Sequence, residues 1–131
     1  MASDATAEPP GLSTRITIAR TFRSAAAWRM ASAVRSAWIY SPRTGRWRAG
    51  PRLARPVAMV GAVAARSRIY AVSEGVFESY APGRGWHLGP ALAVPRHALG
   101  LFASAGRLWA VGGCVVPALE DSRVVESRPL G

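Results

Sequence analysis

The sequence predicts an all-β protein built from repeats, and three observations support this fold class. Residues 47–75 return as residues 86–114 after a shift of 39 positions, with 11 identities in 29 aligned positions. A fixed period of this size is typical of repeat architectures, in which one structural unit stacks on the next. The repeat also consists of short runs of β-prone residues, and clusters of Gly, Pro and Ser separate these runs as turns separate strands.

Each repeat is expected to form four short strands. In the better copy the expected strands are residues 57–64, 69–72, 76–80 and 86–88. Four strands in a unit of this length are typical of one blade of a β-propeller. Because a closed propeller needs about four to eight blades, a chain of 131 residues predicts only a partial one. We expect about two to three four-stranded antiparallel blades.

The chain divides into two parts on this interpretation. Residues 37–131 hold the repeats, which we expect as a partial blade (37–51), a full blade (52–90) and an incomplete blade (91–131). Residues 1–36 form a basic segment of low complexity. Three interpretations of residues 14–37 remain open: a degenerate first hairpin of the repeats, a helix or disordered leader, and a mitochondrial transit peptide.

Four short motifs recur in an order that resembles the kelch-repeat family, in particular the repeats of BTB-kelch adaptor proteins. They are a hydrophobic-aromatic strand ending in a double glycine (108–113), Tyr-x-Pro (40–42 and 80–82), a Trp six or seven residues after that Tyr (Trp47 and Trp86), and Val-x-Glu-Ser (76–79 and 124–127). The Trp-Asp dipeptide of the WD40 family is missing from the sequence. The resemblance covers residues 37–127 and implies a kelch-type β-propeller.

The sequence departs from the kelch pattern at three places. Ser73-Glu74 stands where the first copy should have its double glycine, and Arg128 stands where the last unit should have its tyrosine. Residues 114–122 are an insertion, which we expect to form a longer surface loop. These departures put single blades in doubt more than the family.

Eight residues mark the structural positions of the repeat. We expect six aromatic side chains to fill the space between successive sheets as core: Tyr40, Trp47, Tyr70, Tyr80, Trp86 and Trp109. The pair Gly112-Gly113 suits a close backbone approach or positive φ, because glycine has no Cβ. All eight positions are therefore interpreted as structural.

The charge is strongly positive and unevenly distributed. The formal net charge is +10, all 17 basic residues are Arg, and residues 9–73 hold 12 of them without an acid. A basic patch of this kind can meet nucleic acid, an anionic membrane or an acidic partner. The alternative is an arginine-rich coding bias on a solvated surface, and the sequence leaves both open.

The sequence offers no supported catalytic, cofactor or metal site. His87 and His97 have no cysteine or carboxylate at ligand spacing. Cys114 could pair with His97 as a nucleophile, but a small thiol at the end of a strand is the simpler interpretation. A kelch-type copper oxidase would need ligands that this pattern lacks. We therefore expect neither an enzyme nor a cofactor.

The sequence as a whole favours a non-catalytic protein–protein interaction module. The kelch resemblance implies the substrate-recognition part of a ubiquitin-ligase adaptor, or a truncated fragment of one, with a protein partner of unknown identity. Two alternatives stay open: a basic module for nucleic acid or acidic surfaces, and a remnant of a kelch-type carbohydrate-active enzyme. With one cysteine and no apolar run of membrane length, we expect a cytoplasmic protein. Open strand edges and uncovered faces predict self-association.

Overall fold

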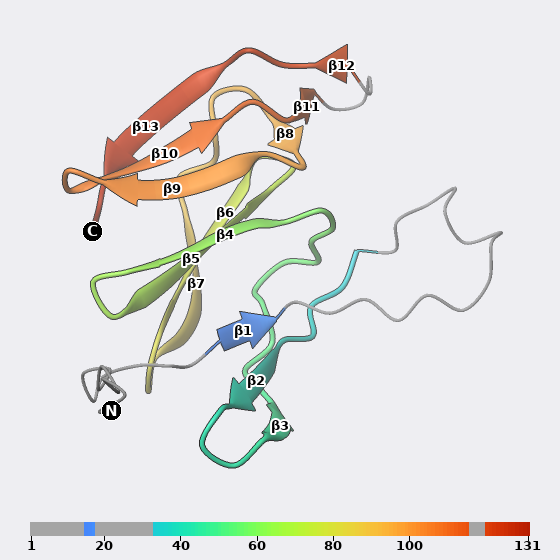
Figure 1. The fold of residues 1–131 in the computed structure, drawn as a ribbon. Helices are drawn as coiled ribbons and strands as arrows, with labels where there is room; N and C mark the ends of the chain where they lie inside the picture. The colour runs from blue at the N-terminus through green and yellow to red at the C-terminus, as the bar shows by residue number, and fades with distance from the viewer. Residues whose placement is uncertain (1–14, 18–32, 116–119) are drawn as a thin grey trace, which may run out of the picture.

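The computed structural model describes residues 15–17, 33–115 and 120–131. These ranges contain only strands, turns and loops, and all strand pairs are antiparallel. The prediction of an all-β protein with antiparallel sheets is confirmed for this part of the chain. Three sheets of three or four strands stack in chain order, as Figure 1 shows, and a small fourth sheet lies at one end of the last.

The middle sheet has four strands in the order β4-β5-β6-β7. They are β4 (Gly61–Ala65), β5 (Arg68–Ser73), β6 (Val76–Ala81) and β7 (Gly85–Gly89). All four predicted strands are present, but the first begins at Gly61 rather than at residue 57. Its expected start is interrupted because Met59 has a positive φ of 49°. The β5–β6 turn also has positive φ, at Glu74 and Gly75, so it closes tightly without a double glycine.

The third sheet has three strands in the order β13-β10-β9. They are β9 (Gly100–Ser104), β10 (Arg107–Val111) and β13 (Val125–Pro129). Two short strands between β10 and β13 join β8, which precedes β9, in a small sheet in the order β12-β11-β8. Its strands are β8 (Arg96–His97), β11 (Cys114–Val115) and β12 (Glu120–Asp121). The expectation that residues 114–122 are only a surface loop is therefore wrong, because β11 pairs with β8.

The first sheet has the order β1-β2-β3. It contains β1 (Arg15–Thr17), β2 (Trp38–Ser41) and β3 (Arg46–Ala49). β1 pairs with β2 along its whole length, so one strand does precede the hairpin. Residues 1–14 and 18–32 lie outside the described part of the chain, and the helix and transit-peptide interpretations fall mostly there.

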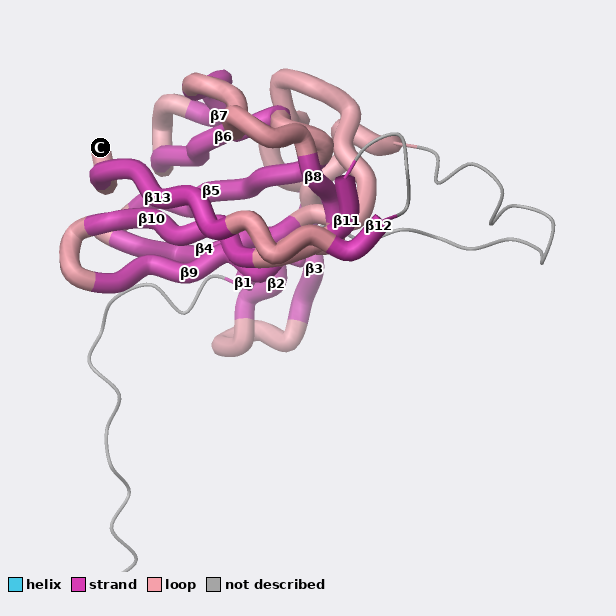
Figure 2. Tube along the Cα trace, turned by 90° about the horizontal axis from the view of Figure 1, so that it is seen from above, coloured by secondary structure: helices cyan, strands magenta, loops and turns pink. Residues whose placement is uncertain are grey.

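Two apolar clusters fill the spaces on the two faces of the middle sheet. Alternation along β5 sends Tyr70 and Val72 to one face and Ala71 to the other, as the period of two in a strand requires. Tyr70 and Val72 pack with Leu101, Leu108 and other residues of the third sheet and its loop. Ala71 packs with residues of the opposite side: Ala37, Leu53, Val57 and Trp86. Viewed from above in Figure 2, the strands of the middle and third sheets overlap.

Two glycine positions show how closely the layers approach. A Cβ on Gly61 would lie 2.8 Å from the carbonyl oxygen of Leu99, so β4 and the start of β9 come together where only glycine fits. Gly112 and Gly113 both have positive φ, 62° and 90°. A Cβ on Gly113 would lie 2.6 Å from the carbonyl oxygen of His97. The glycine pair thus turns the chain toward β11 at a point where a side chain would clash.

Candidate functional site

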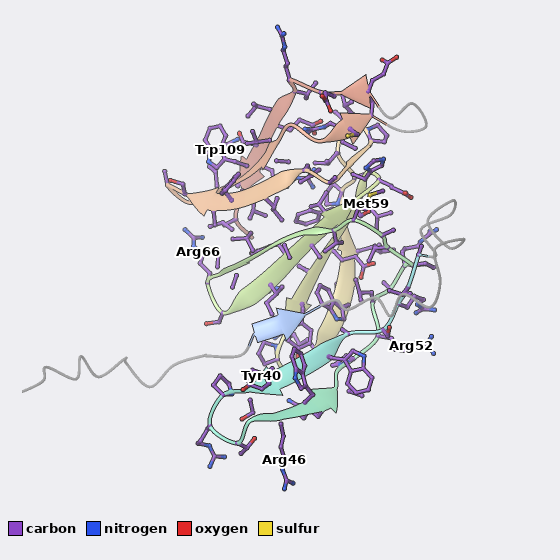
Figure 3. All side chains as sticks on the ribbon, turned by 45° about the vertical axis from the view of Figure 1, so that its right-hand side comes forward. Tyr40, Arg46, Arg52, Met59, Arg66 and Trp109 are labelled. Carbon is purple, nitrogen blue, oxygen red and sulfur yellow. The ribbon has the colours of Figure 1, made fainter. Side chains whose placement is uncertain are left out.

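A basic cleft lies between the first sheet and the β4–β5 hairpin. Its volume is about 460 Å³, and it is lined by residues of both sheets: Ile39, Arg48, Ala64, Ala65, Arg66, Ser67, Arg68, Ile69, Tyr80 and Pro82. The β2–β3 register places Arg48 opposite Ile39, so both side chains lie on the face that meets the middle sheet. Arg66, labelled in Figure 3, stands at the tip of the β4–β5 hairpin. We refer to this site below as the arginine cleft.

The local sequence explains why arginines line this cleft. Arg66 and Ser67 form the two-residue turn between β4 and β5 and both have positive φ, 48° and 59°. Such a turn matches the twist of the flanking strands and leaves its own side chains at the surface. Arg68 starts β5 and recurs as Arg107 in the next repeat. Ile69 turns inward to the apolar cluster that contains Trp86.

Of the three arginines that line the cleft, Arg48 faces it, whereas Arg68 lies on the face of β5 that carries Tyr70 and Val72, and the Arg66 guanidinium lies against Gly106 of the β9–β10 turn. Arg48 and Arg66 are exposed and Arg68 is half-buried, and no carboxylate lines the cleft. Within the described ranges, none of their side chains forms an ion pair or donates a hydrogen bond, and the ion pair that is formed joins Arg96 to Glu126. Guanidinium groups match carboxylate and phosphate oxygens in a bidentate geometry. The cleft can therefore bind an anionic group over an aliphatic floor.

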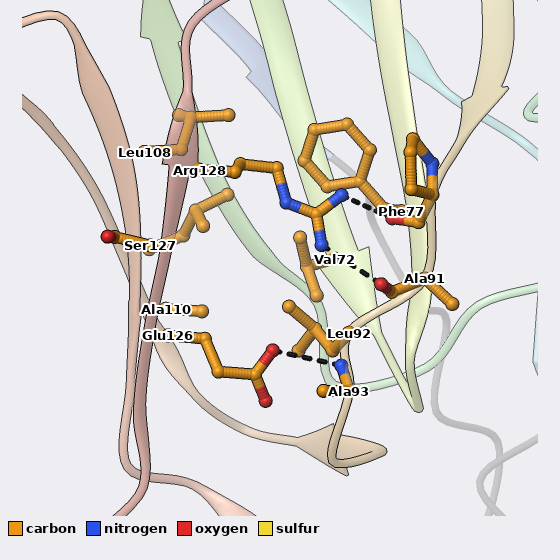
Figure 4. A pocket seen from close by; sticks show the side chains of 12 residues that line it. Val72, Phe77, Ala91, Leu92, Ala93, Leu108, Ala110, Glu126, Ser127 and Arg128 are labelled. Carbon is orange, nitrogen blue, oxygen red and sulfur yellow. Dashed lines mark hydrogen bonds between the residues drawn. The ribbon is translucent and has the colours of Figure 1, made fainter.

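A second, smaller cleft lies between the middle and third sheets, and the side chain of Arg128 spans it. It has a volume of about 270 Å³ and is shown in Figure 4. Arg128 lies 4.5 Å from the centre of the Phe77 ring and donates hydrogen bonds to the carbonyls of Pro90 and Ala91. Arg128, which stands where the kelch pattern has a tyrosine, therefore links the middle and third sheets. The polar side chains that line this cleft are already paired within the protein. We therefore interpret the cleft as part of the packing contact between the two sheets.

Two glutamates fasten the loops between successive sheets, one in each repeat. The carboxylate of Glu78 accepts hydrogen bonds of 2.8 Å from the backbone N–H groups of both Ala54 and Arg55. Glu126 accepts bonds of 3.0 Å from Ala93 and Val94, which lie 39 residues further along. The sequence identified these glutamates only as part of the Val-x-Glu-Ser motif. The sequence offered one local signal for this role, which is that an acid recurs at the same place in the Val-x-Glu-Ser motif of both strands.

The side chain of Arg96 stabilises the second of these contacts, between Glu126 and the loop at residues 93–94, from inside the protein. It is fully buried and donates to the carbonyl oxygens of Gly112 at 2.6 Å and Val124 at 2.9 Å, and to Glu126 at 3.2 Å. Burial raises the pKa of Glu126, but the N–H groups of Val94 and Ala93 and the Arg96 guanidinium outweigh it. The pKa of Glu126 therefore lies below its ordinary value, and the carboxylate is ionised at neutral pH.

The histidines and the cysteine of the sequence analysis lie apart from the arginine cleft. The strand register pairs Cys114 with His97 on one side and with Asp121 on the other. The thiol lies 3.7 Å from a carboxylate oxygen of Asp121, and the buried Nδ1 of His97 has no partner in the described structure. His87 is exposed and bonds the carbonyl of Arg84. The described residues contain no group of three metal-ligating side chains.

The aromatic repeat positions differ in burial more than the sequence predicts. Tyr70 and Trp86 are buried, and Tyr40, Tyr80 and Trp109 are half-buried. Trp47 is exposed, so the expectation that all six aromatics form core is wrong for this residue. The reason is positional, because Trp47 lies on the face of the first sheet that points away from the middle sheet.

Comparison with known proteins adds no assignment. No model of a known protein family matches the chain, and its sequence matches no curated protein significantly. Among the residues that the structure describes, no helix has the length and hydropathy that crossing a membrane requires.

Proposed function

We propose that this chain is a non-catalytic protein-binding module built from kelch-type repeats. The observation that carries the proposal is the arginine cleft: Arg48, whose side chain has no partner among the described residues, lies over a mainly apolar floor between two sheets that Glu78 fastens, and Arg66 and Arg68 stand at the edge of the cleft. A rigid scaffold that presents its binding residues on turns is the usual division of labour in recognition domains. The side chains of Arg48, Arg66 and Arg68 serve recognition in this proposal.

Three features support a partial propeller of the kelch type. The middle sheet is a four-stranded antiparallel unit, as one blade requires. The sheets stack face to face, and the loop that follows each of the first two sheets makes an equivalent backbone bond to its own sheet: Leu53 N–H donates to the carbonyl of Arg35, and Leu92 N–H donates to the carbonyl of Gly75. The glutamates of Val-x-Glu-Ser occupy equivalent joints in both repeats. We propose about two to three blades in the described residues.

The chemistry of the cleft selects the partner. Its floor is mainly apolar, Arg48 faces it and two further arginines stand at its edge, so it fits a segment that alternates carboxylate and apolar side chains. We propose an acidic segment of a partner protein in the cytoplasm as the ligand. A role as the recognition part of a ubiquitin-ligase adaptor rests on the kelch resemblance alone.

One observation favours nucleic acid as a second candidate. Trp38 and Trp47 are exposed on one face of the β2–β3 hairpin, and the exposed Arg46 and Arg48 lie on its other face. Aromatic side chains next to arginines are typical of surfaces that bind single-stranded nucleic acid. Because both tryptophans are exposed, their rings are free to stack on bases. We rank this candidate second because the tryptophans and these arginines lie on opposite faces of the hairpin, so they do not form one continuous surface.

A matched pair of triple variants tests the proposal. The first replaces Arg48, Arg66 and Arg68 with Gln, and the control replaces three exposed arginines outside the cleft, Arg52, Arg84 and Arg123, with Gln. The probe is a fluorescent peptide of alternating Glu and Leu, compared with its Gln and Leu counterpart by anisotropy at physiological salt. We expect the cleft variant to lose at least about tenfold in affinity while the control keeps binding.

Three results would contradict the proposal. Equal losses in both triple variants would show diffuse charge attraction without a cleft site. Equal binding of the Glu and Gln peptides would show that the arginines do not recognise carboxylates. Tighter binding of single-stranded DNA than of the acidic peptide, surviving physiological salt, would favour the second candidate.

A further inference from the structure

The two ends of the stack of sheets carry exposed apolar faces. On the third sheet, the face away from the middle sheet presents Phe102 and Val125, which are 56% and 55% exposed, together with Trp109 and Val111. We call these four residues the outer face of the third sheet. On the first sheet, Trp38, Tyr40 and Trp47 lie on the face away from the middle sheet, and we call them the outer face of the first sheet.

The middle sheet has a face equivalent to the outer face of the third sheet, and in the middle sheet that face is covered by other residues of the chain. In the third sheet, Phe102 pairs with Trp109 and Val111 pairs with Val125. The middle sheet has the same network at equivalent positions, where Val63 pairs with Tyr70 and Val72 with Phe77. There the four residues are covered by the inward face of the next sheet: Leu99, Leu101, Leu108 and Ala110. The outer face of the third sheet is thus a copy of a buried surface.

The same comparison holds at the other end of the stack. In the first sheet the rings of Tyr40 and Trp47 are 5.0 Å apart and inclined by 41°. In the middle sheet the rings of Tyr80 and Trp86 are 5.4 Å apart and inclined by 44°. That second pair packs on the preceding sheet and its loop, and Trp86 Nε1 donates to the carbonyl of Pro51 at 3.1 Å. The outer face of the first sheet is therefore also a copy of a buried surface.

We propose that a second copy of this chain docks head to tail on the first. The outer face of the third sheet of one copy receives the outer face of the first sheet of the next. Within the chain, the equivalent faces already meet twice, once on each side of the middle sheet. The contact between copies continues that series and buries the exposed Trp38, Trp47 and Phe102. Such a heterologous contact closes into a ring or extends into a chain.

The two faces suit each other better than they suit a charged partner. Five of the seven residues that define the two faces are aromatic, and Arg107, which lies on the same face of β10 as Trp109, is already hydrogen-bonded to Ser127. Exposed apolar patches rimmed by polar residues mark protein interaction surfaces. Because one chain carries both members of the repeating contact, a second copy supplies the matching surface without any further partner.

The test blocks one face at a time in the full chain. One variant carries Phe102→Glu and Val125→Glu, and the other carries Trp38→Glu and Trp47→Glu. The control is Leu88→Glu, since Leu88 is exposed on β7 and belongs to neither face. Sedimentation velocity over a concentration series measures association, and circular dichroism confirms that each variant is folded. We expect the wild type and the control to associate, and each face variant to associate at least about tenfold more weakly.

Mixing the two face variants is the decisive measurement. Each variant keeps one intact face, so an equimolar mixture should form a one-to-one dimer that does not grow further. A folded monomeric wild type at high concentration would overturn the proposal. So would a mixture that stays monomeric, or a single face variant that still dimerises fully, since the contact would then pair identical faces. Association that nuclease treatment abolishes would assign the exposed tryptophans to nucleic acid instead.

Discussion

Trp86 and Trp47 hold the same place in the repeat but have different surroundings. Each lies opposite a tyrosine on the neighbouring strand and stacks on it at a similar angle. Trp86 is 8% exposed because the first sheet and its loop cover it, whereas Trp47 is 51% exposed. The repeat therefore fixes the residue type and its pairing within the sheet. Burial is decided by whether another sheet packs on that face.

The largest effect is expected from removing the buried member of this pair. Trp86→Ala deletes a core indole and its hydrogen bond to Pro51, and large-to-small core substitutions of this kind cost about 3–5 kcal/mol. Trp47→Ala should change the free energy of unfolding by less than about 1 kcal/mol, because its ring is half in water. Urea unfolding followed by far-ultraviolet circular dichroism measures both. Equal destabilisation would show that the two positions are equivalent in solution.

The fold was predictable where local pattern decides structure. The β-prone runs and turn residues of 61–89 predict four strands, and all four are present. The break before Gly61 was not predictable, because it depends on long-range contacts. There Glu78 holds residues 54 and 55, and the Ser73 hydroxyl donates to the carbonyl of Ala58.

The sequence predicted the excess of positive charge in this region, but it did not predict the arginine cleft itself. Counting residues shows 12 arginines without an acid between positions 9 and 73. The count does not show that Arg48 of the first sheet meets Arg66 and Arg68 of the middle sheet, because that meeting depends on how two sheets stack. In the same way, Glu126 and Arg96 are 30 residues apart, and local spacing carries no sign of their pairing.

The second prediction compares Arg96 with Val57, which holds the same position in the preceding repeat. Arg96→Val leaves the carbonyls of Gly112 and Val124 without their buried donor and removes the partner of Glu126. We expect a loss of about 3 kcal/mol in the free energy of unfolding, since the Glu126 side chain keeps partial exposure and two N–H donors. Arg123→Val, at an exposed position, is the control and should change stability little. A loss below 1 kcal/mol would show that water replaces the guanidinium.

The third prediction concerns the other glutamate joint. Glu78 is fully buried, and Glu78→Ala leaves the N–H groups of Ala54 and Arg55 unpaired. An unsatisfied buried donor costs about 1–3 kcal/mol. Because water reaches part of this loop, we expect the free energy of unfolding to fall by about 2 kcal/mol for both donors together. Hydrogen exchange should also become faster at these two amides. The exposed Glu120→Ala is the control, and unchanged exchange at residues 54 and 55 would contradict the assigned role.

The smallest expected effect is a pH dependence of the free energy of unfolding that comes from the Glu126 contact, which includes the Arg96 guanidinium. The pKa of Glu126 is lowered from its ordinary value of 4.5 by the N–H groups and Arg96, against the opposing effect of burial. The unfolded chain therefore binds the proton first as pH falls, so the stability from this carboxylate is complete above pH 4.5. It is lost as pH falls through the lower pKa of the folded state. Urea unfolding between about pH 6 and pH 3 should show the wild type losing more stability than Glu126→Gln, whereas Glu74→Gln, at an exposed position, should follow the wild type. If Glu126→Gln keeps the full slope, the carboxylate of Glu126 is not ionised against Arg96 in the folded protein.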